Sequence, residues 1–387
     1  MIVFFVKHIW IFYFPYIALM NESNISLGRL AWQRLKKNRI AFTGLCIILF
    51  FCFVAIFSYV IAPDDAPFAD TQTVEIQASN PGYEQQFLKL PLASVPTSSN
   101  FISRIFLGKK KSYSLLPITS FTIEQDSIAV TKFIDEDTAV LQKYSKQIFT
   151  KEQLERTENL IVSKTYWLGT DVFGRDMLSR MIIGTRVSLA VGLIAVLVSL
   201  SLGIFLGAMA GFYGGKRDAV IMWLINVTWS IPTLLLVFAI TLAMGKGFWQ
   251  IFIAIGLTLW VSVARLVRGQ VMAAKNLEYV QAARALGYGD FRIVSKHILP
   301  NIIGPLLVLA ASNFATAIII EAGLSFLGIG VQPPMPSWGL MIKENYNFII
   351  THRPLLALIP GIAIMLLVLA FNLLGNGLRD AVDVKSI

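Results

Sequence analysis

The sequence predicts an all-α polytopic membrane protein that carries an inserted extracytoplasmic α+β segment. Of its 387 residues, 56% are hydrophobic and only 14% are charged, a composition outside the range of soluble domains. Six apolar segments are each long enough to cross a bilayer, which takes about 20 residues. Between the first two segments the composition is that of a soluble protein. These observations exclude an ordinary soluble enzyme or binding module.

The basic residues give the six spans an orientation. They precede the first span, lie between the second and third, and follow the fourth. By the positive-inside rule these places are cytoplasmic, and so are both termini. The net charge of +10 does not indicate nucleic-acid binding, because the basic residues flank apolar runs. The predicted spans are 39–62, 185–210, 219–243, 247–267, 302–328 and 355–376.

The N-terminal segment 1–38 is predicted to be cytoplasmic. Its first twenty residues are apolar and aromatic but contain Lys7, His8 and Pro15, and they lack the small-residue cleavage site of a signal peptide. Three alternatives stay open for residues 1–19. They are an upstream extension with translation starting at Met20, an interfacial helix, or a seventh partial span.

Residues 63–184 form the predicted extracytoplasmic segment. Within it, residues 63–166 are predicted to form a module of roughly 100 residues with mixed strand and helix. The runs SIAVTKF and TAVLQKY, separated by IDED, are typical of a β-hairpin. Thr150 and Gln153 have capping-box spacing, which predicts a short helix over TKEQLERTENLIV. Two roles stay open for this module. It either packs on the outer face, stiffening it or seating a partner, or recognises substrate directly.

Three arginines before the second span, Arg175, Arg180 and Arg186, are exceptions to the positive-inside rule. Asp171 and Asp176 partly offset their charge. We therefore expect an interfacial helix on the outer face at this point.

A polar insert, EYVQAARALGYGDFRIVSKHILPN, joins the fourth and fifth spans within the loop 268–300. It predicts helix, turn, helix: Gly287 suits a left-handed C-terminal cap and Asp290 can cap the second helix. Pro300 fits the first turn of the next span. The expected apolar faces are Tyr279, Ala282, Ala283 and Leu286 in the first helix, and Phe291, Val294 and Ile298 in the second. Such an insert indicates contact with something outside the bilayer.

Few polar residues lie within the spans, and such residues usually face a bundle interior or a watery path. For the uncharged ones, hydrogen bonding between helices is the alternative. Glu321 lies about 30 Å along the helix from Asn301. This distance brings it to the far boundary of the membrane, so the alternative is that Glu321 is an ordinary interfacial acid. The glycines around it predict a bent or re-entrant end. The candidates for the translocation path or gate are Asn226, Ser230, Asn313 and Glu321.

The sequence predicts no catalytic, cofactor or metal site. The phosphate-loop pattern is absent, since GKKKS lacks its first glycine. His297 and His352 fall on opposite sides of the membrane, which excludes a Ser/His/Asp site. Cys46 and Cys52 lie on different helix faces, with neither a disulfide nor a metal pair implied. Almost no ionisable residue lies near the bilayer midplane, so energy is expected from a partner rather than from proton or sodium coupling.

The insert resembles the EAA loop of ABC importer permeases, whose pattern is EAA, a glycine four residues on, and I-x-L-P or a close variant. Ala282, Ala283 and Gly287 match, and ILP at 298–300 closes the pattern. Gln281 stands at the glutamate position, and Glu278 lies one turn earlier. Over 29–62 and 167–382 the chain resembles the DppC/OppC-type permease of dipeptide and oligopeptide importers. The stretches that carry this are RLAWQRLKKNRIAFTG, WLGTDVFGRDMLSRMIIGTRVSL, EAGLSFLGIGVQPPMPSWGLMI and FNLLGNGLRDAVD.

This resemblance implies the six-helix ABC type I importer permease fold in a bacterial cytoplasmic (inner) membrane, with a core at 185–378 and a cytoplasmic tail at 379–387. It implies, besides membrane lipid, a homologous second permease, two ABC ATPases that bind the ATP and Mg²⁺, and an extracytoplasmic substrate-binding protein. The implied ATPase-coupling residues are Glu278, Gln281, Ala282, Ala283, Arg284, Gly287, Ile298, Leu299 and Pro300.

The function implied by the resemblance is import of di- or oligopeptides through the interface of two permeases, with spans three to five lining the path. In that setting Arg284 pairs with the acidic rim of a groove in the ATPase subunit. Gln281 can form a hydrogen bond there, although it cannot form the charge pair of the motif glutamate. Nickel or another small solute is the alternative substrate. A standalone channel or secondary carrier, or a receptor that uses the outer module, are alternatives of other classes. The alternative for the insert is a helix lying on the inner leaflet.

Overall fold

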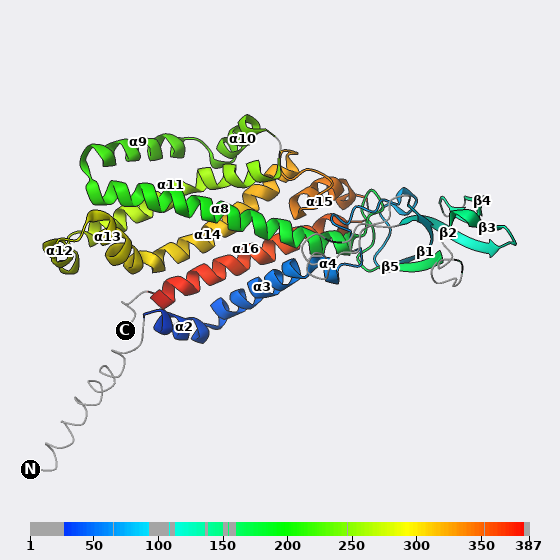
Figure 1. Cartoon of the computed structure of the whole chain (residues 1–387), viewed down its shortest axis with the longest axis horizontal. Helices are drawn as coiled ribbons and strands as arrows, with labels where there is room; N and C mark the ends of the chain where they lie inside the picture. The colour runs from blue at the N-terminus through cyan, green and yellow to red at the C-terminus, as the bar shows by residue number, and fades with distance from the viewer. Residues whose placement is uncertain are drawn as a thin grey trace, which may run out of the picture.

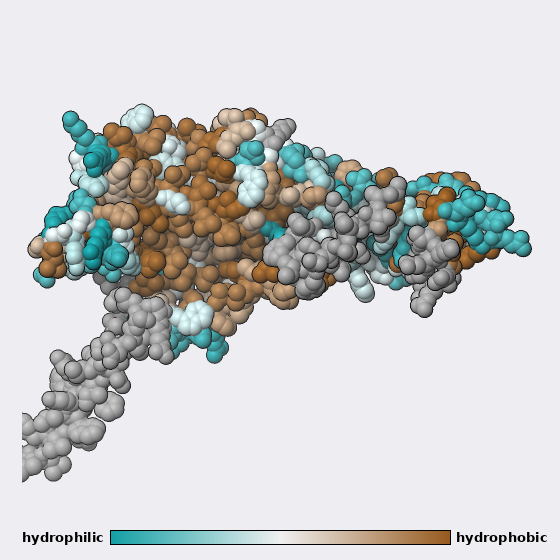
Figure 2. All heavy atoms as spheres, viewed as in Figure 1, coloured by the Kyte–Doolittle hydropathy of each residue, from teal (hydrophilic) through white to brown (hydrophobic). Residues whose placement is uncertain are grey.

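The computed structural model is elongated, with a helical bundle at one end and a β-sheet at the other (Figure 1). It describes residues 27–64, 66–92, 108, 113–135, 138–149, 154, 160–245, 247–351 and 353–382. The predictions for residues 1–19 and for His352, and most of the helix predicted over 150–162, lie outside that part of the chain. A broad apolar belt covers the bundle, and polar surface lies at either end (Figure 2).

Helices build the bundle. They are α2 (Leu27–Lys37), α3 (Arg39–Ile56), α4 (Ser58–Ile61), α8 (Met177–Tyr213), α9 (Gly215–Ser230), α10 (Thr233–Met244), α11 (Phe248–Ala274), α12 (Glu278–Ala285), α13 (Asp290–Ile293), α14 (Ile303–Phe326), α15 (Trp338–Asn345) and α16 (Leu355–Val382), with shorter turns η3 (Val294–Ile298), η4 (Leu299–Ile302) and η5 (Tyr346–Ile349). Two further turns, η1 (Val74–Ile76) and η2 (Lys146–Ile148), lie in the module that holds the sheet. Five helices in the described chain are long and apolar enough to cross a membrane: α3, α8, α11, the helix from α13 through α14, and α16. They coincide with five of the predicted spans.

The third predicted span, 219–243, is not one straight helix. It is divided into α9 and α10, which are bent by 98° at the break, so the described chain has six spans only if this pair counts as one. The break falls at Ile231 and Pro232. Proline lacks the N–H that would continue the helix and pushes the preceding residue out of helical conformation, and Ile231 accordingly has φ −93° and ψ 130°.

The second span begins at Met177 rather than at residue 185, because Asp176 caps it. The Asp176 carboxylate accepts the backbone N–H of Ser179 at 3.0 Å and the hydroxyl of the same residue. From there α8 runs without a break to Tyr213. No separate interfacial helix carries Arg175, Arg180 and Arg186 in the described chain, so that prediction is wrong.

Three glycines spaced four residues apart, Gly203, Gly207 and Gly211, bring α8 against α11. A Cβ on Gly207 would lie 2.5 Å from the Ala264 carbonyl oxygen, and one on Gly203 would lie 2.4 Å from the Cβ of Val263. Small residues at this spacing let two helix backbones approach closely inside a membrane. The helix pair α8 and α11 forms the centre of the bundle (Figure 1).

The outer module is a five-stranded antiparallel sheet with strand order β4-β3-β2-β1-β5. The predicted hairpin is confirmed, because β3 and β4 pair from Ser127 with Ser145 to Phe133 with Ala139. The end of the predicted helix over 150–162 is wrong, since Ile161 and Val162 belong to β5 and pair with β1. The strands are β1 (Tyr83–Pro91), β2 (Tyr113–Ile123), β3 (Ser127–Phe133), β4 (Ala139–Ser145) and β5 (Ile161–Tyr166).

The predicted bent end of the fifth span is confirmed. α14 ends at Phe326, and Gly328 takes a left-handed φ of +83°, which glycine adopts without steric cost. The chain then turns back through a loop to α15, which packs on α14 and α16.

Candidate functional site

The insert between α11 and α14 ends its first helix with a two-bond glycine cap. Gly287 has φ +78°; its N–H is donated to the Arg284 carbonyl at 2.9 Å, and that of Tyr288 to the Ala283 carbonyl at 3.2 Å. This pair of bonds satisfies carbonyls that a helix end leaves without partners. The left-handed cap predicted at Gly287 is therefore confirmed. Asp290 does not cap the second helix; it is the first residue of α13, and Gly289 precedes it without a side-chain bond.

The second helix of the insert continues into the fifth span. α13 passes through a π-helical turn, η3, and a 3₁₀ turn, η4, that contains Pro300. Together with α14 these form one apolar helix of 37 residues from Asp290 to Phe326. Pro300 lies in the first turn of η4. A residue at that position needs no N–H for a helical hydrogen bond, so proline is tolerated there. The second helix of the insert and the fifth span are thus continuous.

The insert is folded against the ends of α8 and α11 that lie away from the sheet. Its buried residues Val280, Ala283, Ile293 and Ile298 join one apolar cluster with residues such as Val271 of α11. The ring of Tyr288 stacks on His297 with centroids 5.7 Å apart. This packing fixes the position of α12 at the end of the bundle opposite the sheet (Figure 1).

Large apolar side chains nevertheless point outward from the insert. Leu286 is 73% exposed and Phe291 is 85% exposed. The sequence predicts one apolar face made of Phe291, Val294 and Ile298. Only Ile298 is buried in the core, so the prediction is wrong for Phe291. Leu286 and Phe291 are therefore the large apolar side chains that the insert leaves most exposed.

The remaining motif residues lie in the same insert. Gln281 donates its side-chain amide to the Asn276 carbonyl at 3.0 Å, a bond that an ionised glutamate cannot make. The Arg284 guanidinium lies 5.6 Å from the centre of the Phe212 ring. Leu299 begins η4, and Glu278 and Ala282 are exposed on α12. Their coupling role stays a prediction.

The four predicted pathway residues are not brought together. Asn226 and Ser230 lie on the exposed side of α9, where the Asn226 side-chain oxygen accepts from Arg265 at 2.8 Å and Ser230 donates to the Val227 carbonyl at 2.8 Å. Asn313 is buried between α14 and α11 and is 3.5 Å from the Ser262 hydroxyl.

Glu321 lies near the opposite, outer end of α14. It is fully buried, and one carboxylate oxygen accepts the Ser325 hydroxyl at 2.7 Å. The Ser325 oxygen in turn accepts the N–H of Val331 at 3.1 Å. Glu321 is therefore not an exposed interfacial acid. It anchors the loop that follows α14.

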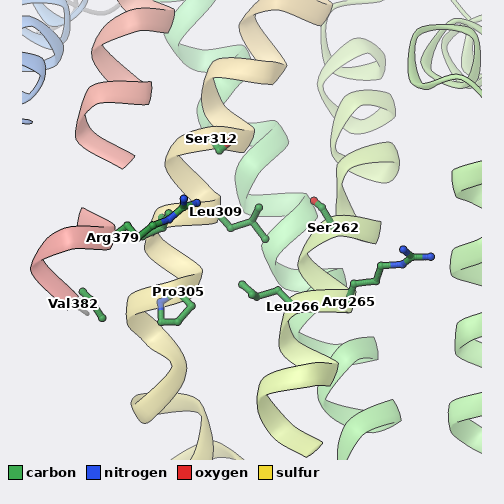
Figure 3. A pocket seen from close by; sticks show the side chains of 9 residues that line it. Ser262, Arg265, Leu266, Pro305, Leu309, Ser312, Arg379 and Val382 are labelled. Carbon is green, nitrogen blue, oxygen red and sulfur yellow. The ribbon is translucent and has the colours of Figure 1, made fainter. Parts of the chain in front are cut away.

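A cavity of about 770 Å³ opens between α11, α14 and α16 in the half of the bundle nearer the insert. Figure 3 shows Ser262, Leu309 and Ser312 on its wall, while the Arg265 side chain extends away from the others. The Arg265 guanidinium instead stacks on Trp229, 3.5 Å from the ring centre. None of the four predicted pathway residues lines this cavity, although Ser262 and Ser312 flank Asn313. This cavity was not predictable from the sequence, because its walls come from three helices that are far apart along the chain.

The arginines before the second span are buried in an ion-pair cluster at the outer end. Arg175 contacts Asp171 and Glu344, each at 2.6 Å. Arg180 contacts the same two carboxylates at 3.4 and 2.9 Å. Beside this cluster, burial raises the pKa of Asp176 above the usual range, against hydrogen bonds from Ser179 that lower it. The cluster ties the segment before α8 to α15.

The fold and the site thus define a multi-pass membrane component whose insert carries exposed apolar side chains at the end of the bundle opposite the sheet. Two family models match the chain: "Binding-protein-dependent transport system inner membrane component" over residues 203–386, and "N-terminal TM domain of oligopeptide transport permease C" over residues 26–81. The chain belongs to this family of ABC importer permeases.

Named relatives agree with this family. The oligopeptide transport system permease protein OppC of Bacillus subtilis is 36% identical over 71% of this chain and 92% of its own length. The glutathione transport system permease protein GsiD of Pectobacterium atrosepticum is 44% identical over 58% and 74%. The dipeptide transport system permease protein DppC of Bacillus subtilis is 41% identical over 59% and 71%. A chain of the MetNI methionine ABC transporter in an inward facing conformation matches 54% of this chain and 98% of its own at 19% identity, with a TM-score of 0.42.

Proposed function

We propose that this chain is one of two permease subunits of an importer for di- or oligopeptides. A homologous permease completes the path, an extracytoplasmic binding protein delivers the substrate, and two separate ATPases, which hold ATP and Mg²⁺, dock on the insert. In this arrangement the chain crosses the inner membrane six times, with α9 and α10 counted as one span, and both termini are cytoplasmic. The chain itself then needs no cofactor, metal or ATPase site.

The observation that carries the proposal is the exposed apolar surface on a rigidly held insert. Leu286 and Phe291 face water, whereas Val280 and Ala283 hold α12 to the bundle. A partner groove that covers the two exposed side chains would remove their apolar area from water, which stabilises association. The continuous helix from Asp290 to Phe326 then connects that groove to the interior of the bundle.

Peptide as the substrate is supported by the relatives, whose names specify oligopeptide, dipeptide and glutathione transport. The cavity next to Asn313 carries the hydroxyls of Ser262 and Ser312 on a largely apolar wall, which supports a role of this region in the path. We assign Ser262, Ser312 and Asn313 to the path. Asn226 and Ser230, on the exposed side of α9, stay candidates for contact with the second permease, and Glu321 for shaping the outer gate.

The test compares two equally exposed apolar residues at opposite ends of the helical bundle. Phe291→Asp places a charge in the docking surface, and Ile350→Asp, at a residue 86% exposed beyond α15, is the control. We expect Phe291→Asp to lose co-purification with the ATPase subunits and ATP-driven peptide uptake, and Ile350→Asp to keep ATPase association. Normal association and uptake of the Phe291→Asp variant, or no ATPase bound to the unaltered chain, would refute the proposal.

A further inference from the structure

Helix α9 is fastened to α11 at both of its ends by arginines. Near the start of α9, the Arg268 guanidinium of α11 donates two hydrogen bonds to the Asp218 carboxylate, at 2.5 and 2.7 Å. Near the end of α9, the Arg265 guanidinium stacks 3.5 Å from the centre of the Trp229 ring and donates to the Asn226 side-chain oxygen at 2.8 Å. Both kinds of contact fix the geometry of a guanidinium. We call these two contacts the arginine clamps.

The clamps add to a narrow apolar contact. In the described chain the buried residues of α9 are Ile221 and Ile225, which join a cluster with residues of α8 and α11. The opposite face of α9 is open, since Val220 is 65% exposed. Asp218 and Trp229 are 11 residues apart, so the two clamps fix about 16 Å of helix. The position of α9 therefore follows that of α11.

The first clamp lies at the base of the insert. Lys275 directly follows α11, and α12 of the insert begins at Glu278. The Lys275 ammonium donates to the Gly211 carbonyl, near the end of α8, at 3.2 Å. Arg268 lies about two turns before Lys275. The ends of α8 and α11 and the start of α9 thus meet where the insert begins, and a displacement of the insert reaches Asp218 through one helix end.

At its other end α9 leads back to the helix that leaves the insert. Two residues after Trp229 the chain breaks at Ile231 and Pro232, and α10 follows. Leu234 of α10 lies against α14, where its Cδ1 would be 3.7 Å from a Cβ on Gly323. Helices α9 and α10 therefore form a brace that runs from the base of the insert to the far end of α14.

We propose that Arg265 and Arg268 are positioning residues that carry movement of the insert to this brace. The insert then acts on the bundle by two routes, one along the continuous helix 290–326 and one through the clamps, α9 and α10. The two routes meet on α14 at Gly323. This inference rests on the proposed function, because docking of ATPases on the insert is the source of the movement.

The test follows α9 by the distance between two spin labels. One label is placed by Val220→Cys on α9 and the other by Leu49→Cys on the exposed side of α3, with Cys46 and Cys52 replaced by alanine. Helix α3 is the reference because it packs on α8 and α16 and belongs to neither route. The chain is assembled with the second permease, both ATPases and the binding protein. Pulsed electron paramagnetic resonance measures the distance with and without ATP and vanadate, and we expect trapping to shift it.

The variants separate the clamps from local charge. Arg265→Gln with Arg268→Gln should abolish the shift while the ATPases stay bound. The matched control, Lys216→Gln with Arg217→Gln, removes two positive charges from exposed residues at the start of α9 and should keep the shift. Asp218→Arg alone should also abolish it. Asp218→Arg with Arg268→Asp should restore it, a gain that a misfolded chain cannot give.

An undiminished shift in the Arg265→Gln, Arg268→Gln variant would overturn the inference. So would an absent shift in the unaltered chain with its ATPases bound, an equal loss in the control, or a charge exchange that restores nothing. An unaltered chain that binds no ATPase would instead refute the proposed function itself, so the two failures are distinguishable.

Discussion

Arg175 and Arg180 show how the fold accommodates arginines that are exceptions to the positive-inside rule. Both are buried, and both depend on the two carboxylates of Asp171 and Glu344. Burying a charge is tolerated only when it is paired and hydrogen-bonded. The cluster therefore stabilises the fold only as a complete set.

Glu344→Gln should destabilise the protein, because it leaves two buried guanidinium groups with one carboxylate between them. Removing a partner from a buried ion pair costs about 3 kcal/mol. The measurement is the melting temperature of the purified chain in detergent, which should fall by several degrees. The matched control is Glu124→Gln, which removes an exposed pair with Lys143 at 2.8 Å and should leave the melting temperature unchanged. Equal melting of the two variants would contradict the assignment.

Residues differed in how well sequence alone predicted them. The left-handed conformation of Gly287 was predictable, because a glycine cap at a helix end depends only on about six neighbouring residues. The exposure of Phe291 was not, because it depends on how α12 and α13 lie against α8 and α11. The pairing of Arg180 with Glu344 was missed because 164 residues separate them.

At the scale of elements, the approach of α8 and α11 decides the stability of the bundle. Gly203, Gly207 and Gly211 allow a contact that larger residues cannot form. Without a hydrophobic force between helices in lipid, such close packing is what holds them together.

Gly207→Leu should separate these two helices. The added side chain meets the Ala264 backbone, and overpacking of this kind costs about 1–3 kcal/mol or more. Yield of folded protein in the membrane and melting temperature in detergent measure the effect. Gly269→Leu on α11 is the control, because nothing lies within 4 Å of a Cβ there. A Gly207→Leu variant as stable as the control would show that the contact is dispensable.

Elements with a strong local pattern were predicted correctly, and those decided by distant partners were not. The hairpin of β3 and β4 is local, and five spans follow from apolar length alone. β5 was mistaken for helix because its partner, β1, lies about 80 residues earlier and outweighs a local capping signal. The break between α9 and α10 was not predicted from the sequence. Although Pro232 lies at that point, the span was predicted from apolar length alone, which indicates a single helix.

At the scale of the whole molecule, the outer module is a separate unit. Its two apolar clusters draw only on residues between Ile76 and Tyr166 in the described chain. Its entry and exit also lie side by side, since Tyr83 pairs with Tyr166. A unit with its own core and adjacent ends can be removed without breaking the rest.

Replacing residues 84–165 by Asn-Gly, a two-residue hairpin turn, should leave the membrane core folded. We expect the shortened chain to be monodisperse and to keep its ATPase partners. Aggregation of the shortened chain would show that the module is needed for folding. Peptide uptake then separates the two open roles: retained uptake assigns the module to packing, and lost uptake with normal ATPase association assigns it to substrate or binding-protein recognition.

The unbroken helix from Asp290 to Phe326 has a consequence for force transmission. A helix of 37 residues is about 55 Å long. If its inner end is held in a partner's groove, a tilt of about 5° displaces the far end by about 5 Å over that length. That far end carries Glu321 and Ser325, which hold the outer loop through Val331. Under the proposed function, the element would act as a lever arm, which converts a rotation of about 5° at the inner face into a displacement of about 5 Å at the outer one.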